Sequence, residues 1–203
     1  MIIGESIDRK KLKEALMDSG DSMVIAGSKT KAKVHIHTNE PAEIFLKCEL
    51  FGSVEGQKAD DMVHQKESAS HQKDLGEIAI VTDSGADFID DDLDIHIVPL
   101  KYNFGEKCYL DKVSQTPAEF YKELRINSHH PQTSQPSPGD FRRQYQFLST
   151  HYRSIISIHI PQKLSGTLQS ANTAMKRIPN GKITIIDSLS ISVGQGLIAT
   201  YAA

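Results

Sequence analysis

The sequence predicts an α/β protein: a doubly wound, mainly parallel sheet preceded by a small, truncated α+β unit. Four short runs rich in β-branched residues are apolar almost throughout, as strands covered on both faces are. Clear helix starts separate these runs, and a change of composition divides them from the first 63 residues. The four runs cover residues 77–82, 94–100, 153–160 and 182–187.

The composition fits folded domains and excludes several other classes of protein. The 203 residues are 38% hydrophobic, which is enough for a real core and excludes a disordered chain. Lysine and arginine number 23 against 26 acidic residues, and the net charge of -3 predicts no nucleic-acid partner. Cys48 and Cys108 are too few for a disulfide framework, and the sequence has neither a secretory signal nor a membrane-spanning run. We therefore expect a cytoplasmic protein without membrane insertion.

The chain is predicted to have three segments: a partial α+β unit over residues 1–63, a linker over 64–77 and an α/β domain over 78–203. In the linker, apolar periodicity gives way to Gln, Lys, Ser, His and Glu. The chain begins where a first strand should already be under way, and it ends inside a helix predicted from Ser190. We therefore expect both units to be truncated.

The first unit is predicted to have the order αββα, with a further strand on each side. Asp8 caps the first helix, Leu12 and Leu16 share its apolar face, and Gly20 ends it. Two β-rich runs follow, and Pro41 stands in the first turn of a second helix. The two runs cover residues 22–26 and 33–37. This order suits half-open α+β sandwiches of the ferredoxin-like kind.

Two helix starts in the second unit have explicit capping sequences. Thr116 is followed by Pro117 and Glu119, which makes a capping box with proline at the first helical position. Ser137 and Pro138 repeat this arrangement before apolar residues at helical spacing. Helices of this kind between buried strands are what a doubly wound sheet requires.

Hydroxyl side chains follow the predicted strands at the edge where open α/β sheets bind ligands. Ser165 and Thr167 flank Gly166 at one helix start, and Thr133 and Ser134 precede another. Two helix N-termini with hydroxyls can hold an anion such as a carboxylate or a phosphate. Plain N-capping is the alternative for each hydroxyl taken alone. Gly166, however, adds nothing to a helix start unless the backbone must approach another group closely.

Histidines suggest a second candidate site. His35 and His37 are two residues apart in a predicted strand, so they share a face and can converge on one metal ion. A third ligand is missing, and Cys48 falls in the helix after the pair. Two solvent-facing histidines are the alternative, since two ligands rarely hold zinc firmly. His129 and His130 are expected in a solvated loop.

Enzyme alternatives find weak support in the sequence. Residues 194–199 match the loose GxGxxA dinucleotide pattern but lie several residues beyond their strand. The P-loop pattern GxxxxGK[ST] and the nucleophile pattern GxSxG do not occur in the sequence. His159 and Ser165 have the residue types of a base and a nucleophile, but a satisfied core histidine is expected inside an apolar strand. An NAD(P)-dependent or hydrolytic α/β enzyme and a purely structural interaction module stay open as alternatives.

Several motifs stand in a defined order along the second unit: Asp83-Ser-Gly, Val98-Pro-Leu, Phe104-Gly-Glu-Lys, Thr133-Ser-Gln-Pro-Ser, Leu164-Ser-Gly-Thr and Ile186-Asp-Ser. With these motifs, residues 78–203 resemble about the first half of the DegV family of bacterial fatty-acid-binding proteins. The resemblance implies that the hydroxyls of Thr133 and Ser165 hold the carboxylate of a long-chain fatty acid, with Ser134 and Gly166 as neighbours. In that family a second domain supplies the rest of the head-group site.

The first unit contains Gly20-Asp-Ser-Met-Val-Ile, Lys33-Val-His-Ile-His-Thr-Asn and Pro41. With these motifs, residues 4–63 resemble the middle domain of fatty acid kinases, which belong with dihydroxyacetone-kinase-like proteins. In those kinases the His-x-His pair helps to hold zinc together with a cysteine from an earlier strand, which implies zinc at His35 and His37 in the intact parent.

Together the two resemblances imply a lipid-binding component that is not itself an enzyme and requires no cofactor. The bound fatty acid would be phosphorylated by the ATP-binding domain of a fatty acid kinase, giving acyl phosphate for phospholipid synthesis.

Overall fold

The computed structural model describes residues 1–57, 76–89, 93–179 and 181–203. Contacts divide the chain into two compact units, residues 1–60 with 101–133 and residues 61–100 with 134–203. Almost all of the linker predicted over 64–77 lies outside the described residues, and the predicted segment boundaries stay predictions. Among the described residues, no helix is both long and apolar enough to cross a bilayer.

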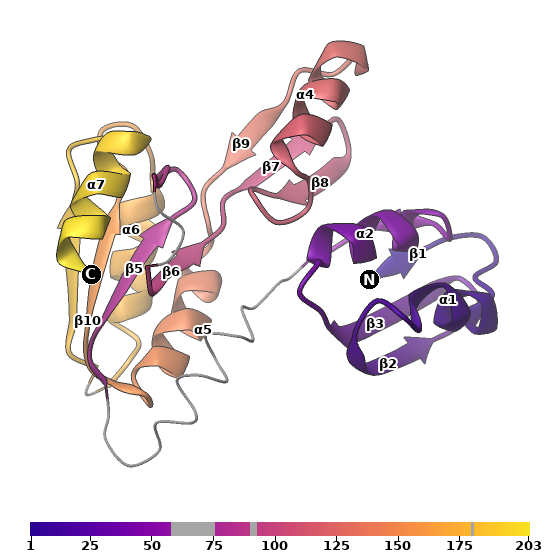
Figure 1. Ribbon diagram of the computed structural model, residues 1–203, viewed down its shortest axis with the longest axis horizontal. Helices are drawn as coiled ribbons and strands as arrows, with labels where there is room; N and C mark the ends of the chain where they lie inside the picture. The colour runs from indigo at the N-terminus through magenta and orange to yellow at the C-terminus, as the bar shows by residue number, and fades with distance from the viewer. Residues whose placement is uncertain (58–75, 90–92, 180) are drawn as a thin grey trace. The chain divides into compact units, whose positions relative to one another are not determined.

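The first 57 residues form an antiparallel sheet with two helices (Figure 1). The sheet has the order β2-β3-β1-β4, where β1 is Ile2–Ile3, β2 is Asp21–Gly27, β3 is Lys31–His37 and β4 is Ser53–Val54. Helices α1 (Arg9–Leu16) and α2 (Pro41–Glu49) supply Leu12, Leu16 and Ile44 to its core. The predicted order αββα with a strand on each side is confirmed.

Helix α1 starts as predicted but ends earlier. The Asp8 carboxylate accepts two backbone N–H groups of the first turn at 3.0 and 3.2 Å. The helix ends at Leu16, so the prediction that Gly20 ends it is wrong. Gly20 instead permits a close approach of two strands, because a Cβ there would lie 2.1 Å from the carbonyl oxygen of His37.

The second unit is built on the predicted parallel sheet (Figure 1). Its order is β11-β10-β5-β6, where β5 is Gly76–Asp83, β6 is Ile95–Val98, β10 is Tyr152–His159 and β11 is Ile183–Asp187. Ala79 and Val81 of β5 face one core cluster, and Ile80 faces another. Burial on both faces therefore explains the nearly continuous apolar character of the strand.

Helices cover both faces of this sheet. Helices α5 (Pro138–Leu148) and α6 (Thr167–Met175) pack on one face, where Phe141, Tyr145, Leu148, Ala171 and Ala174 join the core. Helix α7 (Val193–Ala202) packs on the other face, where Ala199 meets Ile80 and Ile158. The predicted capping box at Ser137 is confirmed, since Ser137 and Asp140 exchange hydrogen bonds at the start of α5.

A small sheet that the sequence analysis did not predict completes the described elements. Strands β7 (Lys101–Phe104) and β8 (Lys107–Leu110) form a hairpin whose turn contains Gly105 at φ +60°, and β9 (Gln132–Ser134) joins them in the order β8-β7-β9. Helix α4 (Pro117–Ile126) begins with the predicted capping box at Thr116. Its Phe120 packs against Tyr102, Phe104 and Tyr109 of the hairpin.

Candidate ligand-binding site

Ser165 lies at the end of the loop between β10 and α6, directly before the glycine that begins the helix. Its Oγ accepts the N–H of Thr167 at 3.2 Å and lies 2.9 Å from Thr167 Oγ1. When the Thr167 hydroxyl donates, both lone pairs of Ser165 Oγ are used and its own O–H is free to donate to an anion. Ser165 is half-buried, whereas Thr167 is buried. Ser165 thus helps to start α6, as the capping alternative predicts, and stays accessible to a ligand.

Gly166 is in close contact with a side chain from the loop after β9. A Cβ at Gly166 would lie 2.2 Å from Oε1 of Gln135, and Nε2 of Gln135 donates to Ser170 Oγ of α6 at 3.2 Å. Gln135 therefore ties the exposed Ser134 loop to the start of α6. Sequence analysis missed this role of Gln135, although the unexplained glycine indicated that some group must approach there.

The predicted pairing of hydroxyls is only partly within one unit. Ser134, Ser165 and Gly166 belong to the second unit, whereas Thr133 is the last residue of the first. Thr133 is exposed in β9. Joint action of Thr133 and Ser165 on one anion stays a prediction.

A chain of buried polar side chains crosses the carboxyl half of β10. Tyr145 Oη lies 2.6 Å from Ser157 Oγ, which lies 2.6 Å from His159 Nε2, and His159 Nδ1 lies 3.0 Å from Asp83 Oδ2. All four side chains are 0% exposed. Their arrangement has the order of a Ser-His-Asp triad, but a substrate cannot reach it. The expectation of a satisfied core histidine at position 159 is confirmed.

Asp83 connects the loop after β5 to the loop after β10. Its Oδ2 accepts the N–H of Ile160 at 3.0 Å and Nε2 of Gln195 at 3.2 Å, while its Oδ1 accepts the N–H of Gly85 at 3.0 Å. Burial raises the pKa of Asp83, but hydrogen bonds from His159, Ile160 and Gly85 outweigh burial and hold the pKa below its usual value. The carboxylate is therefore ionised at neutral pH.

Of the residues that match the dinucleotide pattern, Gln195, Gly196 and Ala199 are buried. A Cβ at Gly196 would lie 1.9 Å from the carbonyl oxygen of Asp87, so the glycine lets α7 approach the loop after β5. Gln195 is buried, and its Nε2 donates to Thr82 Oγ1 at 3.1 Å. Helix packing accounts for this part of the pattern without a nucleotide.

His35 and His37 lie on one face of β3, as predicted, with ring centroids 5.2 Å apart. Within the part of the chain that the structure describes, no three His, Cys, Asp or Glu side chains are grouped to hold a metal ion. Cys48 is buried in the core of the first unit, and burial raises the pKa of its thiol to about 11. His129 and His130 are exposed, as expected for a solvated loop.

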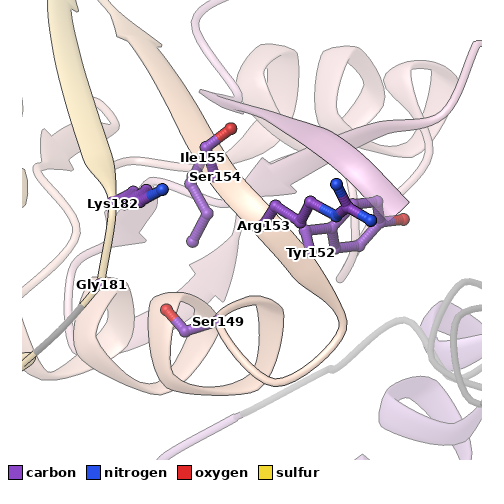
Figure 2. Close-up of a pocket in the computed structure, with 7 residues that line it drawn as sticks. All are labelled: Ser149, Tyr152, Arg153, Ser154, Ile155, Gly181 and Lys182. Carbon is purple, nitrogen blue, oxygen red and sulfur yellow. The ribbon is translucent and has the colours of Figure 1, made fainter. Parts of the chain in front are cut away.

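A small pocket lies at the opposite edge of the parallel sheet, near the amino ends of β10 and β11 (Figure 2). Its volume is about 30 Å³, and Ser149, Tyr152, Arg153, Ser154, Ile155, Gly181 and Lys182 line it. A space of this size holds about one water molecule and cannot accept an acyl chain. This pocket therefore gives no alternative to the hydroxyl-bearing carboxyl edge.

Comparison with protein families decides the relationship of the chain. The model of the DegV family matches residues 77–203, more than half of the sequence. The chain belongs to the DegV family. A second family model, the middle domain of proteins like fatty acid kinase A, matches residues 1–69. Both resemblances seen in the sequence are confirmed.

Curated DegV relatives are identical to this chain at about a third of the aligned positions. Protein DegV of Bacillus subtilis is 35% identical over 130 residues, which are 62% of this chain and 46% of the relative. A DegV domain-containing protein of Clostridium perfringens is 37% identical over 133 residues, which are 64% of this chain and 47% of the relative. The chain thus spans about half the length of the curated relatives it matches.

Solved DegV structures confirm the α/β fold with its parallel sheet. A DegV protein from Thermus thermophilus, described as fatty acid binding, matches with a TM-score of 0.56 and 38% identity over 62% of this chain and 46% of its own. DegV from Bacillus subtilis, described as a fatty acid binding protein, matches with a TM-score of 0.57 and 33% identity over 62% of this chain and 45% of its own.

A more distant structure is the fatty acid kinase B3 protein of Streptococcus pneumoniae, loaded with linoleic acid. Its TM-score is 0.54 at 24% identity, over 62% of this chain and 46% of its own. At this identity the likeness concerns the fold alone.

Proposed function

We propose that this DegV chain binds a long-chain fatty acid and presents its carboxylate to the ATP-binding domain of a fatty acid kinase. The observation that carries the proposal is Ser165, a partly accessible residue at the start of α6 whose O–H is free to donate when the Thr167 hydroxyl donates to its Oγ. The DegV proteins of Thermus thermophilus and Bacillus subtilis, which are described as fatty acid binding, support the same ligand class.

The start of α6 suits a carboxylate for electrostatic reasons. Gly166 has no side chain to cap the first turn, where Ser165 Oγ accepts the N–H of Thr167, and a helix N-terminus has a partial positive charge that favours anions. Ser134 ends β9, and Gln135 lies on the loop that follows, where it contacts Gly166. Thr133 is proposed to supply the second hydroxyl to the ligand.

The kinase partnership rests on the N-terminal segment. Residues 1–69 match the middle domain of proteins like fatty acid kinase A, which supports a kinase ATP-binding domain as the partner. We propose that the segments 1–63 and 78–203 are separate domains joined by a linker, and that the protein acts in the cytoplasm, where ATP is supplied. Zinc at His35 and His37 is proposed where further ligands complete the site.

Fatty-acid binding is tested by native mass spectrometry and calorimetry on the purified chain. A co-purified fatty acid supports the proposal, a co-purified dinucleotide favours an enzyme, and an unmodified chain that fails to take up oleate contradicts it. Ser165→Ala is expected to weaken oleate binding by about 1 to 2 kcal/mol, because an ordinary hydrogen bond contributes about 1 kcal/mol and one to a charged group contributes more. Ser154→Ala, whose hydroxyl donates to the carbonyl of Glu77 at the opposite sheet edge, is the matched control.

The proposal that this chain binds the fatty acid and a separate kinase domain phosphorylates it is tested with ATP and oleate. Any acyl phosphate formed is trapped with hydroxylamine. We expect product only when a kinase ATP-binding domain is added, because the sequence has no P-loop pattern to cradle phosphates. Acyl phosphate formed by the chain alone would show that it is itself a catalyst.

A further inference from the structure

Two carboxylates hold the loop that leads from β10 to Ser165. β10 lies between β5 and β11 in the sheet, and each of these flanking strands ends in an aspartate. Oδ2 of Asp83, at the end of β5, accepts the N–H of Ile160 at 3.0 Å. Oδ2 of Asp187, at the end of β11, accepts the N–H of Gln162 at 3.1 Å. The loop is therefore fixed from both sides before it reaches Ser165.

Asp187 also holds a second loop. Its Oδ1 accepts the N–H of Leu189 at 3.0 Å, in the connection from β11 to α7. Leu189 and Ser192 of this connection have φ values of +50° and +55°, which are strained for residues other than glycine. Such a conformation persists only where surrounding contacts enforce it. One half-buried carboxylate thus joins the Ser165 loop to a strained loop.

The two loops that Asp187 joins have complementary chemistry. The first contains the Ser165 hydroxyl together with Leu164, which is 66% exposed. The second presents Leu189 and Ile191, which are 80% and 54% exposed. A fatty acid needs a hydrogen-bond donor for its carboxylate and apolar surface for its chain. The mutual position of the two loops determines where the Ser165 hydroxyl lies relative to the apolar side chains.

From this geometry we infer that Asp187 is a positioning residue of the fatty-acid site, which holds Ser165 in place for the ligand carboxylate. The inference rests on the proposed function. Both oxygens of Asp187 are engaged by backbone N–H groups, so the side chain acts through the loops. Its negative charge alone would oppose a bound carboxylate. Positioning and charge therefore predict opposite effects when the charge is removed.

The hold of Asp187 on the two loops, called the clamp below, is tested without ligand. The test is amide hydrogen exchange followed by NMR. In Asp187→Ala both N–H groups lose their acceptor, so the amides of Gln162 and Leu189 are expected to exchange about tenfold faster. Glu77→Ala removes an exposed carboxylate at the amino end of β5 and is expected to leave both rates unchanged. Unchanged exchange at Gln162 in Asp187→Ala overturns the inference.

The action of Asp187 through Ser165 is tested by a double-mutant cycle on oleate binding. Asp187→Asn is expected to weaken binding about fivefold in the presence of Ser165, and less than about twofold in a Ser165→Ala background. Equal losses in both backgrounds, or tighter binding of Asp187→Asn, overturn the inference. Absence of oleate binding by the unmodified chain refutes the proposed function instead, and the exchange experiment still decides whether the clamp exists.

Discussion

Two groups of polar side chains lie near the carboxyl ends of the parallel strands, and they differ in what completes their hydrogen bonds. In the buried group, each of Tyr145, Ser157, His159 and Asp83 has its partner inside the protein. In the accessible group, Ser165 has an O–H that an external anion can use when the Thr167 hydroxyl donates to Ser165 Oγ. Similar residue types therefore build the scaffold in one place and stay accessible to a ligand in the other.

Burial is the physical cause of this difference. A buried polar group without a partner costs about 1 to 3 kcal/mol, so the inner group has to be complete in the absence of any ligand. An exposed hydroxyl is satisfied by water, which a ligand carboxylate can replace at little cost. Substitutions in the buried group should therefore change stability, whereas substitutions in the accessible group should change binding.

The largest effect is expected for Asp83→Ala. This change leaves buried His159 without its carboxylate and the N–H of Ile160 without its acceptor. Removing one partner of a buried pair costs about 3 to 5 kcal/mol, so the free energy of unfolding of the second unit should fall by that amount in urea titrations. Glu77→Ala, an exposed carboxylate on the same strand, should change stability by less than about 0.5 kcal/mol. Equal effects of both changes would remove the distinction between the groups.

Acid should remove part of the stabilisation that Asp83 gives to the fold. Because the pKa of Asp83 is lower when folded than when unfolded, ionised Asp83 stabilises the fold above its unfolded pKa of about 3.9. This stabilisation is lost as the pH falls through the lower, folded pKa. The difference in unfolding free energy between the parent and Asp83→Ala should therefore be constant above about pH 5 and narrow in stronger acid. A difference that stays constant down to pH about 2 would contradict an ionised Asp83.

Elements specified by local signals could be predicted from the sequence. The capping boxes at Thr116 and Ser137 depend on residues three positions apart, and both form. The parallel strands were found because burial on both faces makes them apolar throughout. The hairpin around Gly105 was missed, although two short strands, Lys101–Phe104 and Lys107–Leu110, flank this glycine. In the first of them, less buried and buried side chains alternate. The helix end at Gly20 was wrong because this glycine serves a contact with a residue distant in sequence, His37.

The candidate site was predictable to the level of residue types and their edge of the sheet. Ser165 and Gly166 follow a strand and start a helix, which is a local pattern. The partners of these residues were not predictable, because they depend on strand order and register. Asp187 faces His159 across two paired strands, and Asp83 lies 76 residues from His159. Only the order β11-β10-β5 brings both aspartates beside the loop after β10.

A smaller effect on stability is expected at Tyr145, the other end of the buried series of hydrogen-bonded side chains. Tyr145→Phe removes the hydroxyl that lies 2.6 Å from Ser157 Oγ, while Ser157 keeps its contact with His159. The free energy of unfolding should fall by about 1 kcal/mol, the usual net value of one hydrogen bond. Tyr121→Phe, at an exposed tyrosine, is the control and should have no measurable effect. A loss of stability as large as that of Asp83→Ala would mean that the four buried side chains lose their hydrogen bonds together.

The smallest effect is expected at the histidines of the first unit, which extend the comparison to a third polar group. Unlike His159, His35 is exposed, and its ring meets His37 at 5.2 Å. Two imidazoles leave a tetrahedral zinc ion two ligands short. Cys48 is buried in the hydrophobic core. Weak metal binding contributes little to folding, so a chelator should lower the melting temperature of this chain by less than about 1 °C. His37→Ala should respond to the chelator in the same way. A drop of several degrees in the parent that is absent in His37→Ala would show that the pair does hold a metal ion firmly, with ligands beyond the two histidines.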